Sequence, residues 1–214
     1  MPHHPIDHSD VPIRLFKSNF LEFFSHISPI TILVIWLPVI AFFLVRSIVD
    51  AQAGVFPWHI PAGFVIGLFL WTLSEYLLHR FVFHFPPKTP RMERITFLFH
   101  GVHHAQPQCK TRLVMPPVVA IPLAAIFFGL FVLLWSVLFG LPGWVGPTFA
   151  GFLVGYLIYG WMHYATQHFP MRSGYLKYIK RYHMQHHYKT PDARYGVSSP
   201  LWDLVFKTMP SEGK

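Results

Sequence analysis

Three long stretches of the chain contain no Asp, Glu, Lys or Arg; they cover residues 23–45, 51–74 and 113–171. Since about 20 apolar residues span the hydrocarbon core of a bilayer as a helix, the first two stretches predict one membrane helix each. The third is long enough for two helices, and Gly-Leu-Pro-Gly at residues 140–143 is a typical turn sequence between them.

The pattern therefore predicts an all-α integral membrane protein with four transmembrane helices, at about residues 28–49, 57–78, 116–139 and 144–163. We expect the first helix to be retained, because its apolar run is too long for a signal peptide and no small-residue cleavage site follows it. Residues 1–27 would form an N-terminal segment, and residues 28–214 a single domain with histidine-rich segments outside the membrane at 79–115 and 163–209.

Composition and charge agree with this reading. Only 12% of the residues are charged, against roughly 25% in soluble domains, which excludes an ordinary soluble protein. Of the 17 Lys and Arg residues, all except Arg46 lie before the first helix, between the second and third, or after the fourth. The positive-inside rule therefore places both termini and the central loop in the cytoplasm. The net charge of +8 suits an anionic membrane surface and requires no nucleic acid.

Ten of the 15 histidines form four groups, all on the predicted cytoplasmic side. They are His79 and His84; His100, His103 and His104; His163 and His168; and His183, His186 and His187. HxxHH spacing puts three imidazoles on one face of a helix. HxxxxH spacing does not, so its second histidine must lie past the helix end or the helix must distort. Neutral imidazole suits Zn, Cu, Fe and Ni, and ten ligands suffice for two such ions.

Four segments carry a resemblance to a known family: EYLLHRFVFH (75–84), FLFHGVHH (97–104), HYATQH (163–168) and YHMQHHYKTPDARYGVSSPLWDLVF (182–206). They resemble the fatty acid hydroxylase/sterol desaturase superfamily, and within it the fatty acid 2-hydroxylases. The resemblance covers about residues 57–209. It implies a cytosolic helical cap that encloses a histidine-coordinated dimetal centre of two iron ions (Fe²⁺), with zinc as a competing occupant in purified protein. The implied reaction is O₂-dependent hydroxylation of a lipid acyl chain at C2, in a fatty acid or a ceramide/sphingolipid.

The chain departs from this family in two respects. The third histidine motif of the hydroxylases resembles HxxxH, whereas His168 follows His163 by five positions; Gln167 occupies the family spacing and is expected to be a poor substitute. The residues before the first helix cannot hold the fused cytochrome b5 domain of many eukaryotic relatives. We therefore expect a separate electron donor, cytochrome b5-like or ferredoxin-type, besides O₂, the acyl substrate and membrane lipid. The short chain favours a bacterial inner membrane over the endoplasmic reticulum.

Three further residues are candidates for supporting roles. Glu75 lies one helical turn before His79 and is expected to hold that imidazole rather than bind metal itself. Asp203 would orient a C-terminal histidine or cap a helix, and Tyr164 lies beside His163. Alternative functions stay open: a desaturase or a sterol- or carotenoid-modifying oxygenase would use the same ligands. A histidine-rich metal transporter would instead place ligands near the bilayer midplane and on both sides.

Overall fold

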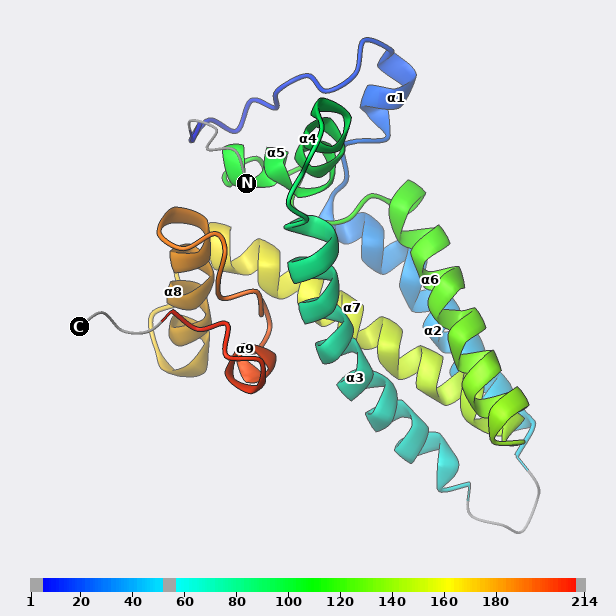
Figure 1. Ribbon diagram of the computed structural model, residues 1–214. Helices are drawn as coiled ribbons and strands as arrows, with labels where there is room; N and C mark the ends of the chain where they lie inside the picture. The colour runs from blue at the N-terminus through cyan, green and yellow to red at the C-terminus, as the bar shows by residue number, and fades with distance from the viewer. Residues whose placement is uncertain (1–5, 52–56, 211–214) are drawn as a thin grey trace. The chain divides into compact units, whose positions relative to one another are not determined.

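The computed structural model describes residues 6–51 and 57–210, and these two ranges contain helices and loops but no strand (Figure 1). The chain divides into two compact units. The histidine unit comprises Met1–Pro29, Leu73–Val114 and Tyr159–Lys214, and the apolar unit comprises Ile30–Thr72 and Met115–Ile158. Of the predicted N-terminal segment, residues 1–5 lie outside the described ranges.

The apolar unit is built from the predicted membrane helices. Its elements are α2 (Pro29–Val49), the first part of α3 (His59–Leu77), α6 (Pro117–Phe131) with its π-helical continuation η3 (Val132–Leu138), the 3₁₀ turn η4 (Pro142–Trp144), and the first part of α7 (Val145–His168). Four segments in the described residues are long and apolar enough to cross a membrane: Pro29–Val49, His59–Phe83, Pro117–Leu138 and Pro142–His168. The all-helical architecture with four such segments is therefore confirmed.

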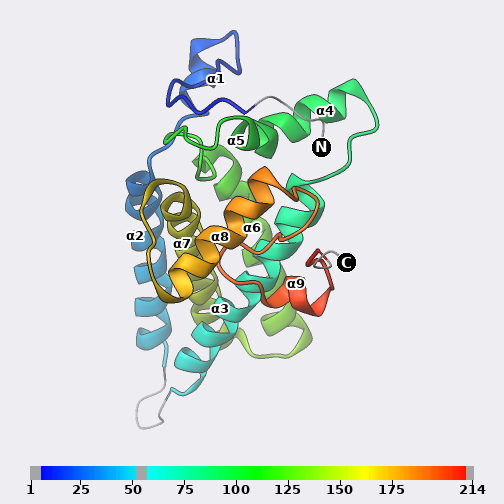
Figure 2. The same ribbon diagram turned by 90° about the vertical axis from the view of Figure 1, so that its left-hand side faces the viewer.

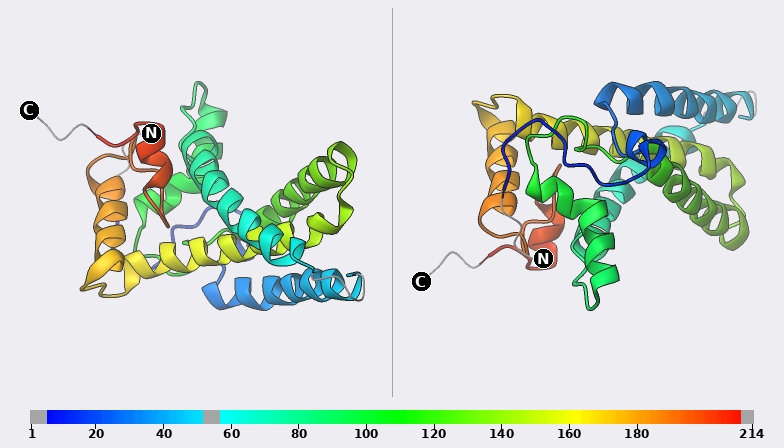
Figure 3. Two further views of the ribbon diagram at one scale, coloured as in Figure 1. Left: turned by 90° about the horizontal axis from the view of Figure 1, so that it is seen from below. Right: turned by 90° about the horizontal axis from the view of Figure 1, so that it is seen from above.

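Within the apolar unit, α7 lies beside both α2 and α3 (Figure 3). Phe43 and Phe149 join α2 to α7 with ring centroids 5.1 Å apart. A Cβ atom added at Gly67 would lie 2.0 Å from the carbonyl oxygen of Thr148, and one added at Gly151 would lie 2.0 Å from that of Phe64. The backbones of α3 and α7 therefore approach so closely that only glycine fits at these two positions, as is typical of membrane helix contacts.

The histidine unit holds the remaining elements. After the last residues of α3 come the π-helix η1 (Leu78–Phe83), α4 (Pro90–Thr96), the π-helix η2 (Phe97–Gly101) and α5 (Val102–Ala105), with α4 and α5 following one another in Figure 2. The unit also includes α1 (Asn19–Phe23), the last turns of α7, α8 (Gly174–Tyr188) and α9 (Leu201–Val205). Helix α7 runs to His168, five residues beyond the predicted end at 163, because no helix-breaking residue occurs before Pro170.

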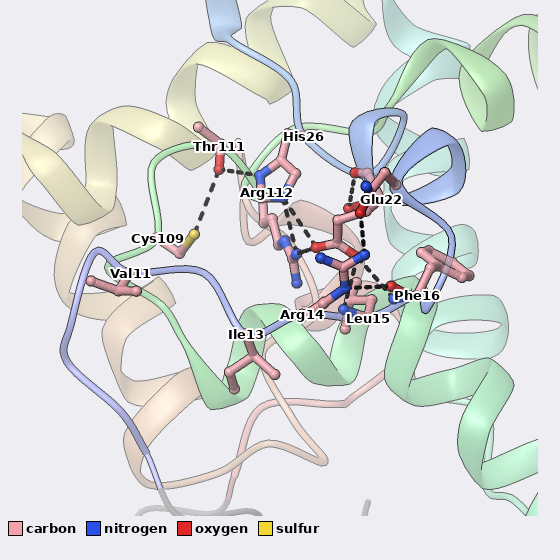
Figure 4. Close-up of polar contacts among 12 residues, drawn as sticks. Val11, Ile13, Arg14, Leu15, Phe16, Glu22, His26, Cys109, Thr111 and Arg112 are labelled. Atoms are coloured by element: carbon pink, nitrogen blue, oxygen red, sulfur yellow. Dashed lines mark hydrogen bonds and ion pairs between the residues drawn. The ribbon is translucent and has the colours of Figure 1, made fainter.

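Polar contacts tie the N-terminal segment to the loop that follows α5 (Figure 4). The carboxylate of Glu22 accepts hydrogen bonds from the backbone N–H groups of Leu15 and Phe16 at 2.9 and 2.8 Å. The same carboxylate pairs with the guanidinium of Arg112, whose side chain is only 3% exposed. Because a buried charge that loses its partner is strongly destabilising, this ion pair fixes where the segment meets the loop.

Candidate metal centre

Nine of the ten predicted histidines gather in two adjoining groups inside the histidine unit. The first group is His79, His84, His100, His104 and His186, and the second group is His103, His163, His183 and His187. Within each group one ring nitrogen of every histidine lies within 4.8 Å of the others. All of these side chains are buried except that of His104, which is half-buried.

A local distortion of the second membrane segment brings His84 to the same helix face as His79. The π-helix η1 replaces the α-helical pattern here, and the N–H of His84 donates to the carbonyl oxygen of His79, five residues earlier, at 3.0 Å. Because a π-helical turn closes on the fifth residue instead of the fourth, the HxxxxH spacing returns to the same face. The two imidazole centroids are 4.9 Å apart. The distortion that the spacing required is therefore present at this motif.

Each HxxHH motif contributes to both groups. On α8, His183 and His187 are one turn apart, with Nε2 atoms separated by 3.0 Å in the second group. His186 of the same helix faces the first group, where its Nε2 lies 3.1 Å from that of His84. The HGVHH motif divides likewise, with His103 in the second group and the other two histidines in the first. Each three-histidine motif therefore contributes histidines to both groups and not to one group alone.

The arrangement of nitrogen atoms fits two metal ions. The Nε2 atom of His100 lies 3.0 Å from that of His79 and 3.1 Å from that of His104. The Nε2 atom of His103 lies 2.7 Å from that of His163 and 3.0 Å from that of His187. Neighbouring nitrogens around one ion with metal–nitrogen bonds of about 2.0–2.1 Å lie roughly 3 Å apart.

Hydrogen bonding alone does not explain these contacts. A neutral imidazole carries one N–H, so one Nε2 atom cannot share good hydrogen bonds with two others in this way. His79 and His186 donate their Nδ1–H groups outward to the backbone carbonyl oxygens of Tyr195 and Ala193, the second at 2.7 Å. Their Nε2 lone pairs therefore point into the first group, where converging lone pairs are repulsive unless a cation lies between them. The site is a set of neutral donors suited to Zn, Cu, Fe or Ni.

Burial keeps these imidazoles in the form that binds metal. It lowers the pKa of His104 to about 3. It also lowers the pKa of the other group members outside the membrane segments: His84, His100, His103, His183, His186 and His187. Neighbouring imidazoles lower these values further, because like charges would meet. At neutral pH the rings are uncharged, so no proton has to leave before a metal ion binds.

Two carboxylates hold the loop that orients His79. Asp203 accepts hydrogen bonds from the backbone N–H groups of Tyr195 at 2.9 Å and Gly196 at 2.7 Å. Glu75 accepts from the N–H groups of the next two residues, both at 2.7 Å, and from the hydroxyl of Ser198. Because the carbonyl of Tyr195 accepts from His79, both carboxylates act on this imidazole through the loop. This geometry supports the expectation that Glu75 holds His79 in place rather than binding metal.

We expect Glu75→Gln to weaken metal binding. Glutamine keeps one carbonyl oxygen but replaces the other by an NH₂ group, which cannot accept the hydrogen bonds that Glu75 receives from the loop. The carbonyl of Tyr195 would then lose its fixed position against His79. We expect metal affinity to fall by roughly 10–100-fold, measured by chelator competition on folded protein. Glu93→Gln, at an exposed position on α4, is the matched control; equal affinities for the two variants would show that Glu75 does not position the site.

His168 and Tyr164 are not brought to either group. Their rings pack against each other, with centroids 4.5 Å apart. The physical reason is that α7 stays α-helical through His168, so five residues of spacing rotate it about 140° away from His163. Gln167, one residue earlier, faces the second group instead: its side-chain nitrogen lies 3.1 Å from Nε2 of His103 and 3.3 Å from Nε2 of His183. Its spacing of four from His163 is the sequence signal that points to this placement.

The backbone carbonyls that orient two of the imidazoles had no sequence signal. The carbonyl oxygens of Tyr195 and Ala193 fix the orientation of His79 and His186, and a backbone atom is present at every residue. Tyr159 stacks on His163 with centroids 5.7 Å apart, one α-helical turn before it.

Comparisons with known proteins give one consistent result. The family model described as "Fatty acid hydroxylase" matches residues 64–208. The chain is 39% identical over 212 residues to dihydroceramide fatty acyl 2-hydroxylase FAH2 of Arabidopsis thaliana, which covers 97% of this chain and 84% of that protein. It is 35% identical over 209 residues to FAH1 of the same plant, covering 98% and 84%. A solved structure described as full-length scs7p, with only the hydroxylase domain visible, superposes with a TM-score of 0.81 at 35% identity, covering 90% of this chain and 70% of that one.

Proposed function

Because the chain belongs to the fatty acid hydroxylase family, we propose that it hydroxylates a lipid acyl chain at C2, with O₂ as oxidant and two iron ions held by the two histidine groups. The proposed substrate is a fatty acid or the acyl chain of a ceramide, the two substrate classes after which the family and its plant relatives are named. The observation that carries the proposal is the pair of buried imidazole groups whose nitrogens converge.

The reaction needs two electrons besides O₂. One oxygen atom enters the C–H bond as a hydroxyl group, and the other leaves as water after taking up two electrons and two protons. The electrons are proposed to come from a separate protein, cytochrome b5-like or ferredoxin-type. When bound, iron supplies the redox chemistry that O₂ activation requires and that Zn²⁺ lacks.

The residues of this chain have three tasks in the proposed reaction. Nine imidazoles hold the ions, and burial keeps those outside the membrane segments uncharged. The carbonyls of Tyr195 and Ala193 set the direction of two of these rings. Glu75 and Asp203 hold the loop that carries the carbonyls. These contacts support preorganised ligand positions, which favour one metal geometry over others.

The proposed location is a membrane with both termini in the cytoplasm, in a bacterial inner membrane rather than the endoplasmic reticulum. The four apolar segments and the distribution of Lys and Arg support the orientation. A site on the cytoplasmic side lies within reach of a soluble electron donor, while the acyl substrate enters from the lipid.

Product analysis tests the proposal. Iron-loaded protein in lipid nanodiscs, supplied with a reducing system, ¹⁸O₂ and either a long-chain fatty acid or a ceramide, should yield a 2-hydroxy product that carries one ¹⁸O atom. Mass spectrometry with fragmentation locates the oxygen. A product that has lost two hydrogens would show a desaturase instead, and oxygen at another carbon would contradict the C2 assignment. Metal flux into vesicles without oxygen consumption would favour a transporter.

A further inference from the structure

The second group contains four histidines, whereas the first contains five, and Gln167 lies at the fifth position. Its side chain is 6% exposed and extends from α7 one turn beyond His163. The terminal amide is 3.1 Å from Nε2 of His103 and 3.3 Å from Nε2 of His183. Gln167 is therefore within the distance that separates the imidazole nitrogens from one another.

The chemistry of the amide decides which of its ends faces the group. In the structure the NH₂ end faces the imidazoles, and Oε1 is buried without a hydrogen-bond partner among the described residues. The two ends have nearly the same shape, so their assignment follows from their surroundings. Nε2 atoms that coordinate a metal have no lone pair left to accept an N–H, and an NH₂ group next to a cation is repelled. A carbonyl oxygen at the same point is attracted.

We propose that Gln167 turns its carbonyl oxygen toward the second group and serves as the fifth ligand of the second metal ion. This inference rests on the proposed dimetal centre. It gives the two sites different ligand sets: five nitrogens in the first, and four nitrogens with one neutral oxygen in the second. In the orientation that the structure has, Oε1 is a buried acceptor without a partner in the described part of the chain, and coordination of a metal ion would satisfy this oxygen.

The unequal ligand sets have a measurable consequence. A carbonyl oxygen is a harder donor than imidazole and binds the later divalent metals less well. The second site should therefore hold Zn²⁺ more weakly than the first, and the difference should depend on residue 167. Nothing comparable is expected for a glutamine elsewhere in the histidine unit.

The test is a zinc titration of the metal-free 214-residue protein in detergent against a chromophoric chelator. Wild type should bind two Zn²⁺ with two different affinities. Gln167→Leu, which removes the oxygen at similar volume, should weaken the weaker site by about tenfold or more and leave the tighter site unchanged. Gln167→Glu keeps an oxygen donor and should retain both sites, and Gln167→His should tighten the weaker one. Gln185→Leu is the matched control, because Gln185 is half-buried on α8 and belongs to neither group.

The outcomes distinguish the ligand role of Gln167 from the existence of the dimetal centre. Two zinc ions bound with wild-type affinities in Gln167→Leu would overturn the ligand role of Gln167 and leave the dimetal centre standing. Failure of the wild type to bind two ions would overturn the dimetal centre itself. Circular dichroism and gel filtration check folding; if Gln167→Leu does not fold, Gln167→Ala, which also removes the oxygen, decides by the same criterion.

Discussion

Replacing His187 by alanine is expected to abolish lipid hydroxylation and to remove one of the two metal ions. Its Nε2 atom lies 3.0 Å from Nε2 of His103 and 3.0 Å from Nε2 of His183, so it lies at the middle of the second group. Its ring also stacks on that of His104 in the first group, with centroids 4.3 Å apart. The change therefore removes a proposed ligand and a contact between the groups. Loss of a residue that only hydrogen-bonds to a metal ligand typically lowers metal affinity or activity about 10–100-fold. Loss of a ligand itself should lower them more.

The measurements are product formation by mass spectrometry and metal content per protein by elemental analysis. His59→Ala is the control: the ring of His59 lies 6.3 Å from that of Trp144 in the apolar unit and belongs to neither group. We expect that variant to keep both metal ions and wild-type turnover. Full activity of His187→Ala in folded protein would show that the second group is not the reaction centre.

The second large effect concerns the identity of the metal. Protein stripped of metal should be inactive, and Fe²⁺ should restore hydroxylation whereas Zn²⁺ should not. Both ions suit imidazole, so zinc is expected to fill the same sites. Zinc has no accessible redox change, however, and cannot supply electrons to O₂. The expected result is recovery with iron and only background product with zinc, while zinc occupancy is shown by elemental analysis.

A competition experiment tests whether Zn²⁺ and Fe²⁺ bind at the same sites. Adding Zn²⁺ before Fe²⁺ should inhibit in proportion to the zinc retained, because both ions use the same nitrogens. Activity that persists after complete removal of iron, or that zinc restores, would contradict an iron-dependent reaction. The zinc titration of the residue 167 variants does not depend on turnover. A negative result in that titration therefore leaves the test of the metal's identity unaffected, and the reverse also holds.

The helices and the histidine groups were predictable because both signals are local in sequence. An uncharged stretch such as residues 30–45 is visible without knowledge of its neighbours, and cationic residues mark the ends of the stretches. The four segments agree with prediction to within a few residues, apart from the second and fourth, which extend further at their C-terminal ends, to Phe83 and His168. Those ends depend on how the helix continues beyond the apolar run, which hydropathy does not report.

The internal arrangement of the site could not be predicted in the same way. HxxHH spacing places its histidines on one face of a helix, but the division of His183 and His186 between groups depends on where α8 packs. The two HxxxxH motifs show the limit most clearly. They have the same spacing, yet the π-helix brings His84 to the site, and the regular helix α7 leaves His168 outside and Gln167 inside.

The π-helix at Leu78–Phe83 also makes the site sensitive to the length of the chain. A π-helical turn holds one residue more than an α-helical turn, so deleting one residue there would leave a well-formed α-helix with all of its hydrogen bonds. Such a deletion would rotate His79 and Glu75 by about 100° relative to His84, because each α-helical residue turns the chain by that angle. Substitutions between His79 and His84 can preserve the first histidine group, but an insertion or deletion there cannot. Natural variation between His79 and His84 should therefore change residue types and never their number.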